Sequence, residues 1–358
     1  MRKRFVSGFL LFALVATRVE GQDTPFTPFG IIPVLDAYLE SLRQQAGIPG
    51  MSAALVRDGT VIWDRGYGFQ DVADRVQASP NTPYLVGDIS GTLAAVLLLQ
   101  CVEQRRLELD RPLREYGLEL SERDVTLRQL LSHTSFDPSA EPFLYSPDRY
   151  AQLTEVMEWC APQPYRKSVA HRILNRLGMI DSVPGPDLDD PRLPLPSGLF
   201  EPAHLDRYRA VLSRIAVPYR VDGRGRTQPT DVPDMTMNAA EGLVSTVRDL
   251  ARLDGALDAR VLLGRNTLEA AWTRTIGRRG TPVPMGLGWF VQTHRGQRLI
   301  WHFGYIPNAY SSLILKVPDR NVTLILLANS DGLSAPFDLG KGDVTRSLFA
   351  ALFLRLVT

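Results

Sequence analysis

Segments of β-strand character lie at both ends of this chain and enclose a long middle of helical character. Near the N-terminus, residues 51–56 and 60–63 are separated by Asp58-Gly59, and such a pair between two β-type runs is a strong hairpin signal. Further β-type runs, joined by turn signals at Arg295-Gly296 and Pro318-Asp319, cover residues 287–293, 298–302, 310–317 and 322–329. The last connection is short enough for antiparallel neighbours. We therefore expect an α/β fold in which strands from both ends form one antiparallel sheet, with a mainly helical lobe inserted between them.

Three segments predict helices that flank this sheet. Residues 33–45 repeat apolar side chains at helical spacing, and residues 345–356 have a closing amphipathic pattern. Residues 92–102 (TLAAVLLLQCV) are apolar on nearly every face, which predicts a helix buried inside the protein. Two stretches rich in Pro, Asp and Gly, residues 183–202 and 220–233, are assigned no regular structure. They are interpreted as connectors, with a lid as the alternative.

The N-terminal residues 1–21 have the layout of a secretory signal peptide. A basic head, MRKR, precedes an apolar stretch over residues 5–17 and a small-residue end. The stretch is short, because a membrane-spanning helix needs roughly 20 apolar residues. We expect cleavage near Gly21 and export of residues 22–358 to the periplasm or the extracellular space, with no membrane span afterwards. No cysteine lies at the junction, so we expect no lipid anchor; the alternative is an uncleaved membrane anchor.

Composition narrows the classes of partner. The formal net charge is +1, so the chain lacks the basic footprint that nucleic acids or anionic membranes attract. The histidines are scattered without the spacing of metal ligands, and no Gly-rich phosphate loop occurs in the required context. The five histidines are His133, His171, His204, His294 and His302. We expect neither a metal nor a cofactor.

The chain contains two cysteines, Cys101 and Cys160. Both lie in apolar, helix-like contexts, which suits small buried side chains. An oxidising compartment would permit a bridge, but the spacing does not require one. We therefore expect both thiols to be buried and free.

Several segments, taken in order, resemble one known family. Residues 48–112, which contain IPGMSAALVRDGTVIWDRGYG and TPYLVGDISGTLAAVLLLQCVEQRRLELDRP, are similar to the start of the β-lactamase-related serine hydrolases. That family includes class C β-lactamases, D,D-peptidases and esterases. The match continues in family order with VTLRQLLSHTS (125–135), LGM (177–179), EGLVSTVRDLARL (241–253), GLGW (286–289) and WHFG (301–304).

The resemblance implies a β-lactamase/transpeptidase-like fold in a single domain over residues 22–358. Its sheet lobe is expected over residues 30–85 and 283–358, and its helical lobe over residues 86–282. In this fold the sheet is antiparallel, is built from both termini and is flanked by helices.

The resemblance also points to a missing nucleophile. Members of this family carry a Ser-x-x-Lys motif at the start of the buried helix. Residues three apart share one helix face, so the lysine can take the proton of the serine hydroxyl. Alignment of TPYLVGDISGT with this motif places Asp88 at the serine position and Gly91 at the lysine position. Both halves of the nucleophile machinery are therefore absent, and the resemblance implies a degenerate member.

Two further family motifs are matched in part. Tyr145-Ser146-Pro147 matches a Tyr-x-Asn motif, whose tyrosine assists proton transfer, but it has proline in place of asparagine. His302-Phe303-Gly304 matches the His-x-Gly form of a strand motif that lines the cleft. A histidine there could donate a hydrogen bond to an anionic ligand group or oxyanion; the alternative is a core-edge histidine satisfied by backbone.

We predict Tyr145 and His302 as the remaining catalytic-type residues of a degenerate site. The predicted ligand-binding residues are Asp88, Ser90, Tyr145, His302 and Gly304.

Nothing in the sequence restores the lost pair. Ser90 lies two positions from Asp88, and residues at this separation on a helix point to different faces. A nucleophilic Ser90 would need a base at position 93, where the chain has Leu93. None of the few lysines follows a serine by three residues, and Lys316 is interpreted as a solvated surface charge. Asp88 is expected to be an ionised helix N-cap, with a carboxylate nucleophile as the alternative. An ionised Asp88 would disfavour anionic ligands such as penicillins.

These features leave three functional hypotheses. The first is an exported pseudoenzyme that retains the cleft for a small-molecule or cell-wall peptide ligand. The second is an active serine hydrolase of esterase, D,D-peptidase or β-lactamase type that uses a shifted nucleophile. The third is an envelope scaffold whose function is a protein interface. An open cleft beside Asp88, Tyr145 and His302 would favour ligand binding. The sequence leaves the oligomeric state open.

Overall fold

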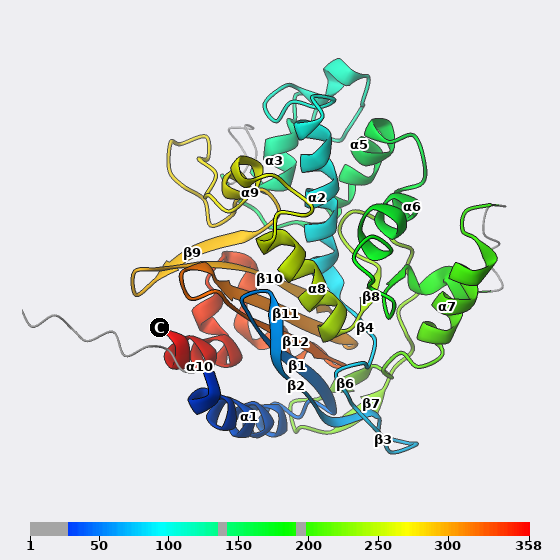
Figure 1. Cartoon of the computed structure of the whole chain (residues 1–358), viewed down its shortest axis with the longest axis vertical. Helices are drawn as coiled ribbons and strands as arrows, with labels where there is room; N and C mark the ends of the chain where they lie inside the picture. The colour runs from blue at the N-terminus through cyan, green and yellow to red at the C-terminus, as the bar shows by residue number, and fades with distance from the viewer. Residues whose placement is uncertain (1–27, 135–141, 191–197) are drawn as a thin grey trace, which may run out of the picture.

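The computed structural model describes residues 28–134, 142–190 and 198–358. The expected signal peptide over residues 1–21 lies outside the described residues. Within them, a seven-stranded antiparallel sheet has the order β3-β2-β1-β12-β11-β10-β9 (Figure 1). Its strands are β1 (Gly50–Arg57), β2 (Thr60–Asp71), β3 (Val76–Gln77), β9 (Phe290–His294), β10 (Gln297–Ile306), β11 (Tyr310–Val317) and β12 (Val322–Ala328).

The two ends of the chain are joined by the pairing of β1 with β12. This pairing is antiparallel and places Met51 opposite Ala328. The β1–β2 hairpin turns at Asp58 and Gly59, whose φ angles of +48° and +73° match the turn type that suits the twist of the flanking strands. The expected α/β fold, with an antiparallel sheet built from both ends and a mainly helical insertion, is confirmed.

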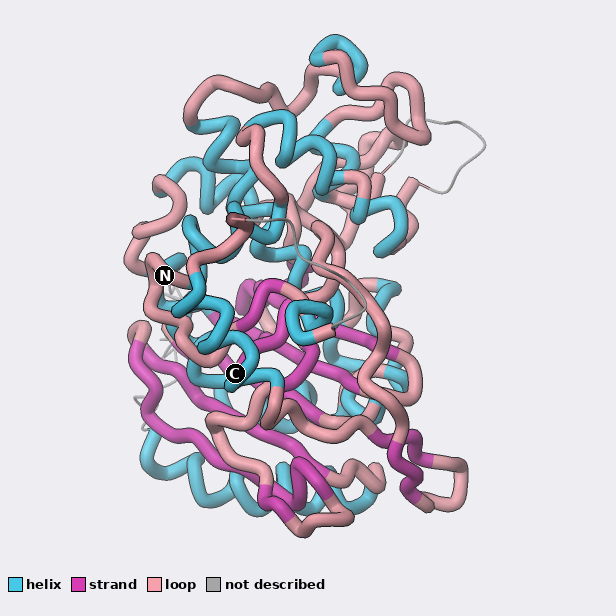
Figure 2. The backbone as a smooth tube through the Cα atoms, turned by 90° about the vertical axis from the view of Figure 1, so that its right-hand side faces the viewer, coloured by secondary structure: helices cyan, strands magenta, loops and turns pink. Residues whose placement is uncertain are grey.

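Each face of the sheet has its own apolar core, because successive side chains of a strand point to opposite faces. Leu55 of β1 faces the core beneath α1 (Pro28–Gln45) and α10 (Leu348–Val357). The next residue, Val56, faces α8 (Val247–Asp258) and the helical lobe. Figure 1 shows α1 and α10 side by side, and Figure 2 shows the strands gathered in one half of the molecule and most of the helices in the other.

The helical lobe is built around α2 (Ser90–Glu103), which is buried over residues 90–101. The expected buried helix is therefore confirmed. Other α-helices of the described residues are α3 (Leu127–Leu131), α4 (Pro147–Ala151), α5 (Leu153–Cys160), α6 (Tyr165–Val169), α7 (Pro202–Leu212) and α9 (Arg265–Ala271). None of the helices in these described ranges has the length and apolar character needed to cross a bilayer.

Short elements complete the described chain. A small sheet has the order β4 (Tyr84–Leu85), β8 (Leu243–Ser245) and β5 (Val183–Pro184). Residues Ala170–Leu174 (η3) form a π-helical turn that continues α6. The 3-10 turns are η1 (Gly87–Ile89), η2 (Leu113–Tyr116), η4 (Pro186–Asp189), η5 (Pro318–Arg320), η6 (Asp331–Leu333), η7 (Ala335–Phe337), η8 (Leu339–Lys341) and η9 (Val344–Arg346).

The proline-rich stretches contain more regular structure than expected. Within residues 220–233 the expectation is wrong, because β6 (Tyr219–Val221) and β7 (Thr227–Pro229) form a hairpin. Its turn is held by the carboxylate of Asp222, which accepts backbone N–H donors from within the turn. In residues 183–202, β5 pairs with β8, and the part from 191 to 197 lies outside the described residues.

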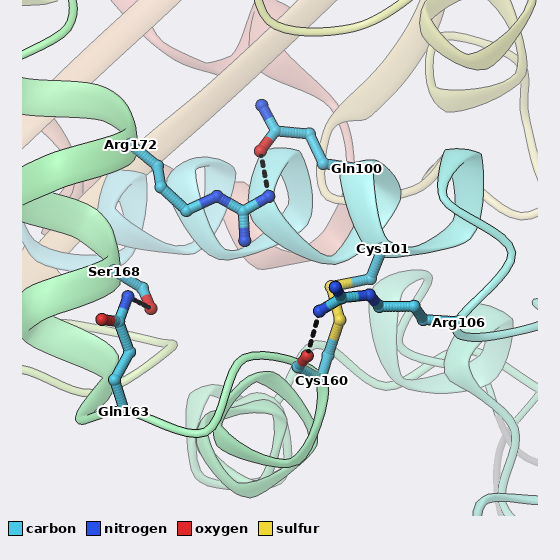
Figure 3. The surroundings of a disulfide bond; sticks show 7 residues. All are labelled: Gln100, Cys101, Arg106, Cys160, Gln163, Ser168 and Arg172. Carbon is cyan, nitrogen blue, oxygen red and sulfur yellow. Dashed lines mark hydrogen bonds between the residues drawn. A yellow bond between two sulfur atoms is a disulfide. The ribbon is translucent and has the colours of Figure 1, made fainter.

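The expectation of two free cysteines is also wrong. Cys101 on α2 and Cys160 at the end of α5 form a disulfide (Figure 3). The two residues are 59 positions apart in sequence, and they meet because α5 packs against α2. Local apolar context predicts burial of each sulfur correctly, but it carries no information about which helix packs beside which.

Lys316 is not the solvated surface charge that the sequence suggests. It is 4% exposed, and it lies on the face of β11 that α8 covers. Its Nζ donates to Asp254 at 3.1 Å, to Asp258 at 2.7 Å and to the hydroxyl of Thr323 at 3.0 Å. Two carboxylates one helical turn apart compensate the burial of this ammonium group.

Candidate functional site

The start of α2 lies directly against strand β10. In η1, Gly87 has φ +56°, and a Cβ there would lie 2.9 Å from the backbone nitrogen of Tyr305. A Cβ at Gly304 would lie 2.0 Å from the carbonyl oxygen of Val86. The absence of side chains at both positions allows this close approach. Asp88 is thereby placed beside the end of β10.

Asp88 does not cap α2, which corrects the expected N-cap. No side chain caps this helix, and Asp88 Oδ2 instead accepts the backbone N–H of Tyr305 at 3.1 Å. Asp88 is buried, with an exposed fraction of 8%. The pKa of Asp88 is raised to about 7, and burial is the largest cause. The hydrogen bond from the Tyr305 N–H lowers this pKa, and the charge of Glu241 raises it further. The pKa therefore lies near neutral pH, where part of the carboxyl population is protonated, in contrast to the expected full ionisation.

The residues at the motif positions lie around one small cavity. It is lined by Asp88 from η1, Gly91 from the start of α2, Tyr145 from the segment before α4, and His302 from β10. The lining is completed by His133, Pro147, Tyr150 and Ala240. The space open to water is about 10 Å³, which is room for about one water molecule. The four motif positions are brought together, but the space between them is almost completely filled.

Tyr150 fills the space that a side chain at position 91 would need. A Cβ at Gly91 would lie 3.1 Å from Tyr150 Cε1, which is a tight contact. The Tyr150 hydroxyl donates to the carbonyl oxygen of Gly91 at 3.0 Å. Tyr150 was not predicted as a site residue; it lies within α4, five positions after Tyr145, which precedes that helix. Its ring lines the cavity beside the position of the missing lysine.

The sequence Ser146-Pro147 begins helix α4, which accounts for the proline at the position of the asparagine. Ser146 is the N-cap, and its hydroxyl accepts the N–H of Arg149 at 3.2 Å. Proline is favoured at the first helical position, where its missing N–H costs nothing. Tyr145 therefore enters the site immediately before a capped helix. Its pKa is raised well above its usual value by burial and then by the charge of Asp88, so the phenol is protonated.

His302 is buried and satisfied by backbone. It is 3% exposed, and its Nδ1 lies 2.8 Å from the carbonyl oxygen of Phe303. A carbonyl only accepts, so Nδ1 carries the proton and Nε2 is left as an acceptor. Burial lowers the pKa of His302 to about 4. The neutral ring, 6.1 Å between centroids from Tyr145, therefore needs a second proton before Nε2 can donate to an anionic ligand.

His133 holds the two tyrosines of the cavity apart. Its ring lies 4.6 Å from that of Tyr145 and is stacked 5.0 Å from that of Tyr150, as measured between centroids. Its Nδ1 accepts the N–H of Ser146 at 3.1 Å. Burial and the neighbouring His302 lower its pKa well below the usual value, so this ring is also neutral.

Ser90 and Gly304 do not line the cavity. The Ser90 hydroxyl is fully buried, donates to the carbonyl oxygen of Gly87 at 2.7 Å and accepts the N–H of Leu243 at 3.2 Å. Gly304 contacts Val86, and its carbonyl oxygen accepts from Ser334. Of the predicted ligand-binding residues, Asp88, Tyr145 and His302 therefore lie together. Across the described part of the chain, no group of three or more His, Cys, Asp or Glu side chains is arranged to hold a metal ion.

Known proteins share sequence and structural similarity with this chain. "Protein flp" of Staphylococcus aureus (strain NCTC 8325 / PS 47) is 22% identical over 340 residues, which cover 84% of this chain and 64% of that protein. The chain thus spans less than two thirds of the length of this curated relative. The octameric penicillin-binding protein homologue from Pyrococcus abyssi has a similar structure, with 21% identity, a TM-score of 0.70, and coverage of 90% of this chain and 77% of that one.

The D-alanine carboxypeptidase AmpC from Burkholderia cenocepacia is a second structural neighbour, with 17% identity, a TM-score of 0.68, and coverage of 91% of this chain and all of that one (100%). At such identities the structural likeness establishes the fold alone. The family described as Beta-lactamase matches residues 35–343, which is most of the chain. This protein therefore belongs to the Beta-lactamase family, the group of β-lactamase-related serine hydrolases that its ordered motifs resemble.

Proposed function

We propose that this protein is an exported, catalytically inactive member of the family that functions by binding rather than by hydrolysis. One observation carries the proposal. Asp88 and Gly91 stand where the family has its nucleophile and base, and both line a cavity of about 10 Å³. A serine hydroxyl is a weak nucleophile until a neighbouring base takes its proton, and here both members of the pair are missing.

Among the described residues, three groups that could be considered offer no substitute for that pair. The Ser90 hydroxyl is fully buried and already hydrogen-bonded on both sides. Lys316 is held by two carboxylates of α8. His302, with a pKa of about 4, is too weak a base to take a hydroxyl proton at neutral pH.

Two features support export to the periplasm or the extracellular space. Residues 1–21 have the composition of a cleavable signal peptide. The disulfide between Cys101 and Cys160 fits an oxidising compartment, because disulfides are rare in reducing cytosol.

The ligand that we propose is a small molecule or a cell-wall peptide. A solved neighbour described as a D-alanine carboxypeptidase is in keeping with this class. The cavity holds about one water molecule, so a ligand of this class requires side chains of the lining, such as Tyr150, to move. The small size of the cavity also supports a second candidate, an envelope scaffold that binds another protein through its surface. Thermal stabilisation by a cell-wall peptide separates the two, since only the first is stabilised by it.

Labelling with a reactive-serine probe tests the lack of catalysis. The purified mature protein is treated with a fluorophosphonate or a fluorescent penicillin, its intact mass is measured, and a chromogenic ester is assayed in parallel. We expect no adduct and no turnover above background. A stoichiometric adduct on Ser90, or ester turnover that Ser90→Ala abolishes, would overturn the proposal.

Rebuilding the pair provides a positive control for the same assay. Asp88→Ser alone should stay inactive, because residues that act as a unit are strongly non-additive. Asp88→Ser with Gly91→Lys restores the one-turn geometry, but the new lysine must displace the ring of Tyr150. We therefore expect trace activity from the double variant and more from a triple variant with Tyr150→Ala. Full activity is not expected, since Pro147 cannot position substrate as an asparagine amide would. Turnover by Asp88→Ser alone would contradict this reasoning.

A further inference from the structure

A second groove lies at the end of α2 that is farthest from Asp88. It is an open groove of about 600 Å³ between the last turn of α2 and the π-helical turn η3. Arg172 and Arg176 form its cationic side, His171 lies beside them, and Val261 contributes an apolar surface. At 1.5 Å per residue, the length of α2 separates this groove from the candidate site by about 18 Å. It is therefore a different site from the one that the family motifs mark.

The two arginines that line this groove, Arg172 and Arg176, bond to neutral acceptors, and so does Arg106, whose charge acts on Arg172. Arg172 donates to Gln100 Oε1 at 2.7 Å, and Arg106 donates to a backbone carbonyl beside the disulfide at 2.8 Å (Figure 3). Arg176 donates to the carbonyl oxygen of Val261 at 2.9 Å. Each guanidinium has five N–H donors in a fixed fork, so each of these contacts leaves several donors for a ligand.

These three arginines have no ion pair within the described residues, in contrast to two arginines that line a separate pocket. Arg111 pairs with Glu115 at 2.9 Å, and Arg128 pairs with Asp110 at 2.6 Å. One carboxylate, that of Glu103, does line the groove, but it accepts the backbone N–H of the residue that precedes α9 at 2.8 Å. The positive charges of the groove thus outnumber its negative charge and are not paired with it.

The cationic groups also lie close enough to repel one another. Burial, followed by the positive charges of Arg106 and Arg176, lowers the pKa of Arg172 below its usual value. An anion placed between these groups would reduce the repulsion. The walls are held in place, because the disulfide ties α2 to α5 and the bond from Arg172 to Gln100 ties η3 to α2 (Figure 3). A π-helical turn of this kind is frequent at functional sites.

We propose that this groove binds an organic phosphate, with Arg172 and Arg176 holding the phosphate oxygens and Val261 supporting the apolar part of the ligand. The planar fork of arginine matches the oxygens of a phosphate in a bidentate manner, which favours an oxyanion over a simple halide. The volume of the groove exceeds that of a phosphate ion, and Val261 is 44% exposed beside it. The proposal stands apart from the lack of catalysis at Asp88, and either can fail without the other.

Calorimetric titration of the mature protein tests this site with phenyl phosphate, inorganic phosphate and benzyl alcohol at one fixed ionic strength. We expect saturable binding of phenyl phosphate, weaker binding of inorganic phosphate, and none of the uncharged alcohol. Arg176→Gln, an exposed change that leaves the fold intact, should weaken phenyl phosphate binding about ten-fold. Arg172→Lys should weaken it to a similar extent, because lysine keeps the charge but loses the fork.

Arg105→Gln is the matched control, since Arg105 is an exposed arginine at the same end of α2 that does not line the groove. Its binding should equal that of the unchanged protein, and thermal unfolding of every variant checks the fold. Three results would overturn the proposal: no saturable binding of either phosphate, equal weakening by Arg105→Gln and Arg176→Gln, or binding of benzyl alcohol as tight as that of phenyl phosphate.

Discussion

Replacing Asp88 by asparagine should change how the stability of this protein depends on pH. The carboxyl group is buried beside β10, accepts one backbone N–H from Tyr305 and has no cationic partner among the described residues. Its pKa is raised from 3.8 to about 7, with burial as the largest cause. The folded protein therefore holds this proton more tightly than the unfolded chain does.

The sign of the effect follows from proton linkage. Below about pH 4 the carboxyl group is protonated in both states, and its burial carries no ionisation cost. As the pH rises from about 4 to about 7, the unfolded chain loses the proton first, so stability is lost across this window. A pKa difference of about 3 corresponds to about 4 kcal/mol when the loss is complete. Asparagine has nearly the same shape and does not ionise, so Asp88→Asn should escape this loss.

Urea unfolding of both proteins between pH 5 and pH 8, monitored by tryptophan fluorescence, measures this difference in stability. We expect the difference in the free energy of unfolding, Asp88→Asn minus the unchanged protein, to increase by about 3 kcal/mol from pH 5 to pH 8. The burial of His133 and His302 lowers both of their pKa values, which makes stability rise with pH up to about 6.5. That trend is common to both proteins and cancels in the comparison.

The control is Asp148→Asn, which changes an exposed carboxylate in the first turn of α4. This variant should not show the gain in stability with pH that is expected of Asp88→Asn. If Asp88→Asn shows no such gain, then Asp88 titrates near its ordinary pKa and water reaches it in the folded protein. The description of Asp88 as a buried carboxyl group would then be wrong.

Two further substitutions test the contacts that sequence patterns did not predict. Lys316→Met should destabilise the fold by about 3–5 kcal/mol, because it leaves the buried carboxylate of Asp254 without its partner. Lys341→Met removes an exposed pair and should have a much smaller effect. Urea unfolding measures both, and equal effects would show that the Lys316 cluster is solvated. Replacing Cys101 and Cys160 together by alanine should cost about 2–4 kcal/mol, since the unfolded chain gains freedom. Thermal unfolding with and without reductant checks this, and an unchanged midpoint would contradict it.

The sequence alone determined the framework of the fold. Strand β11 (Tyr310–Val317) has the bounds predicted for it, and β12 ends one residue before its predicted end. Both strands are defined by local apolar runs and by the turn residues between them. The buried helix α2 was likewise predictable, because apolar side chains on every face leave it no place on a surface. The order of the family motifs was visible for the same reason, since each is a continuous segment.

The chemistry of the site was decided by contacts between distant segments. Asp88 has the composition of a helix cap, yet its partner is the backbone of Tyr305, 217 residues away. Lys316 resembles a surface charge until α8 brings a carboxylate 62 residues distant to its ammonium group. Position 91 was recognised as lacking a lysine, but only packing reveals that the ring of Tyr150 stands beside it. Local pattern predicts which residues are buried, whereas the partner of a buried polar group depends on how separate elements pack, and that depends on the whole tertiary structure.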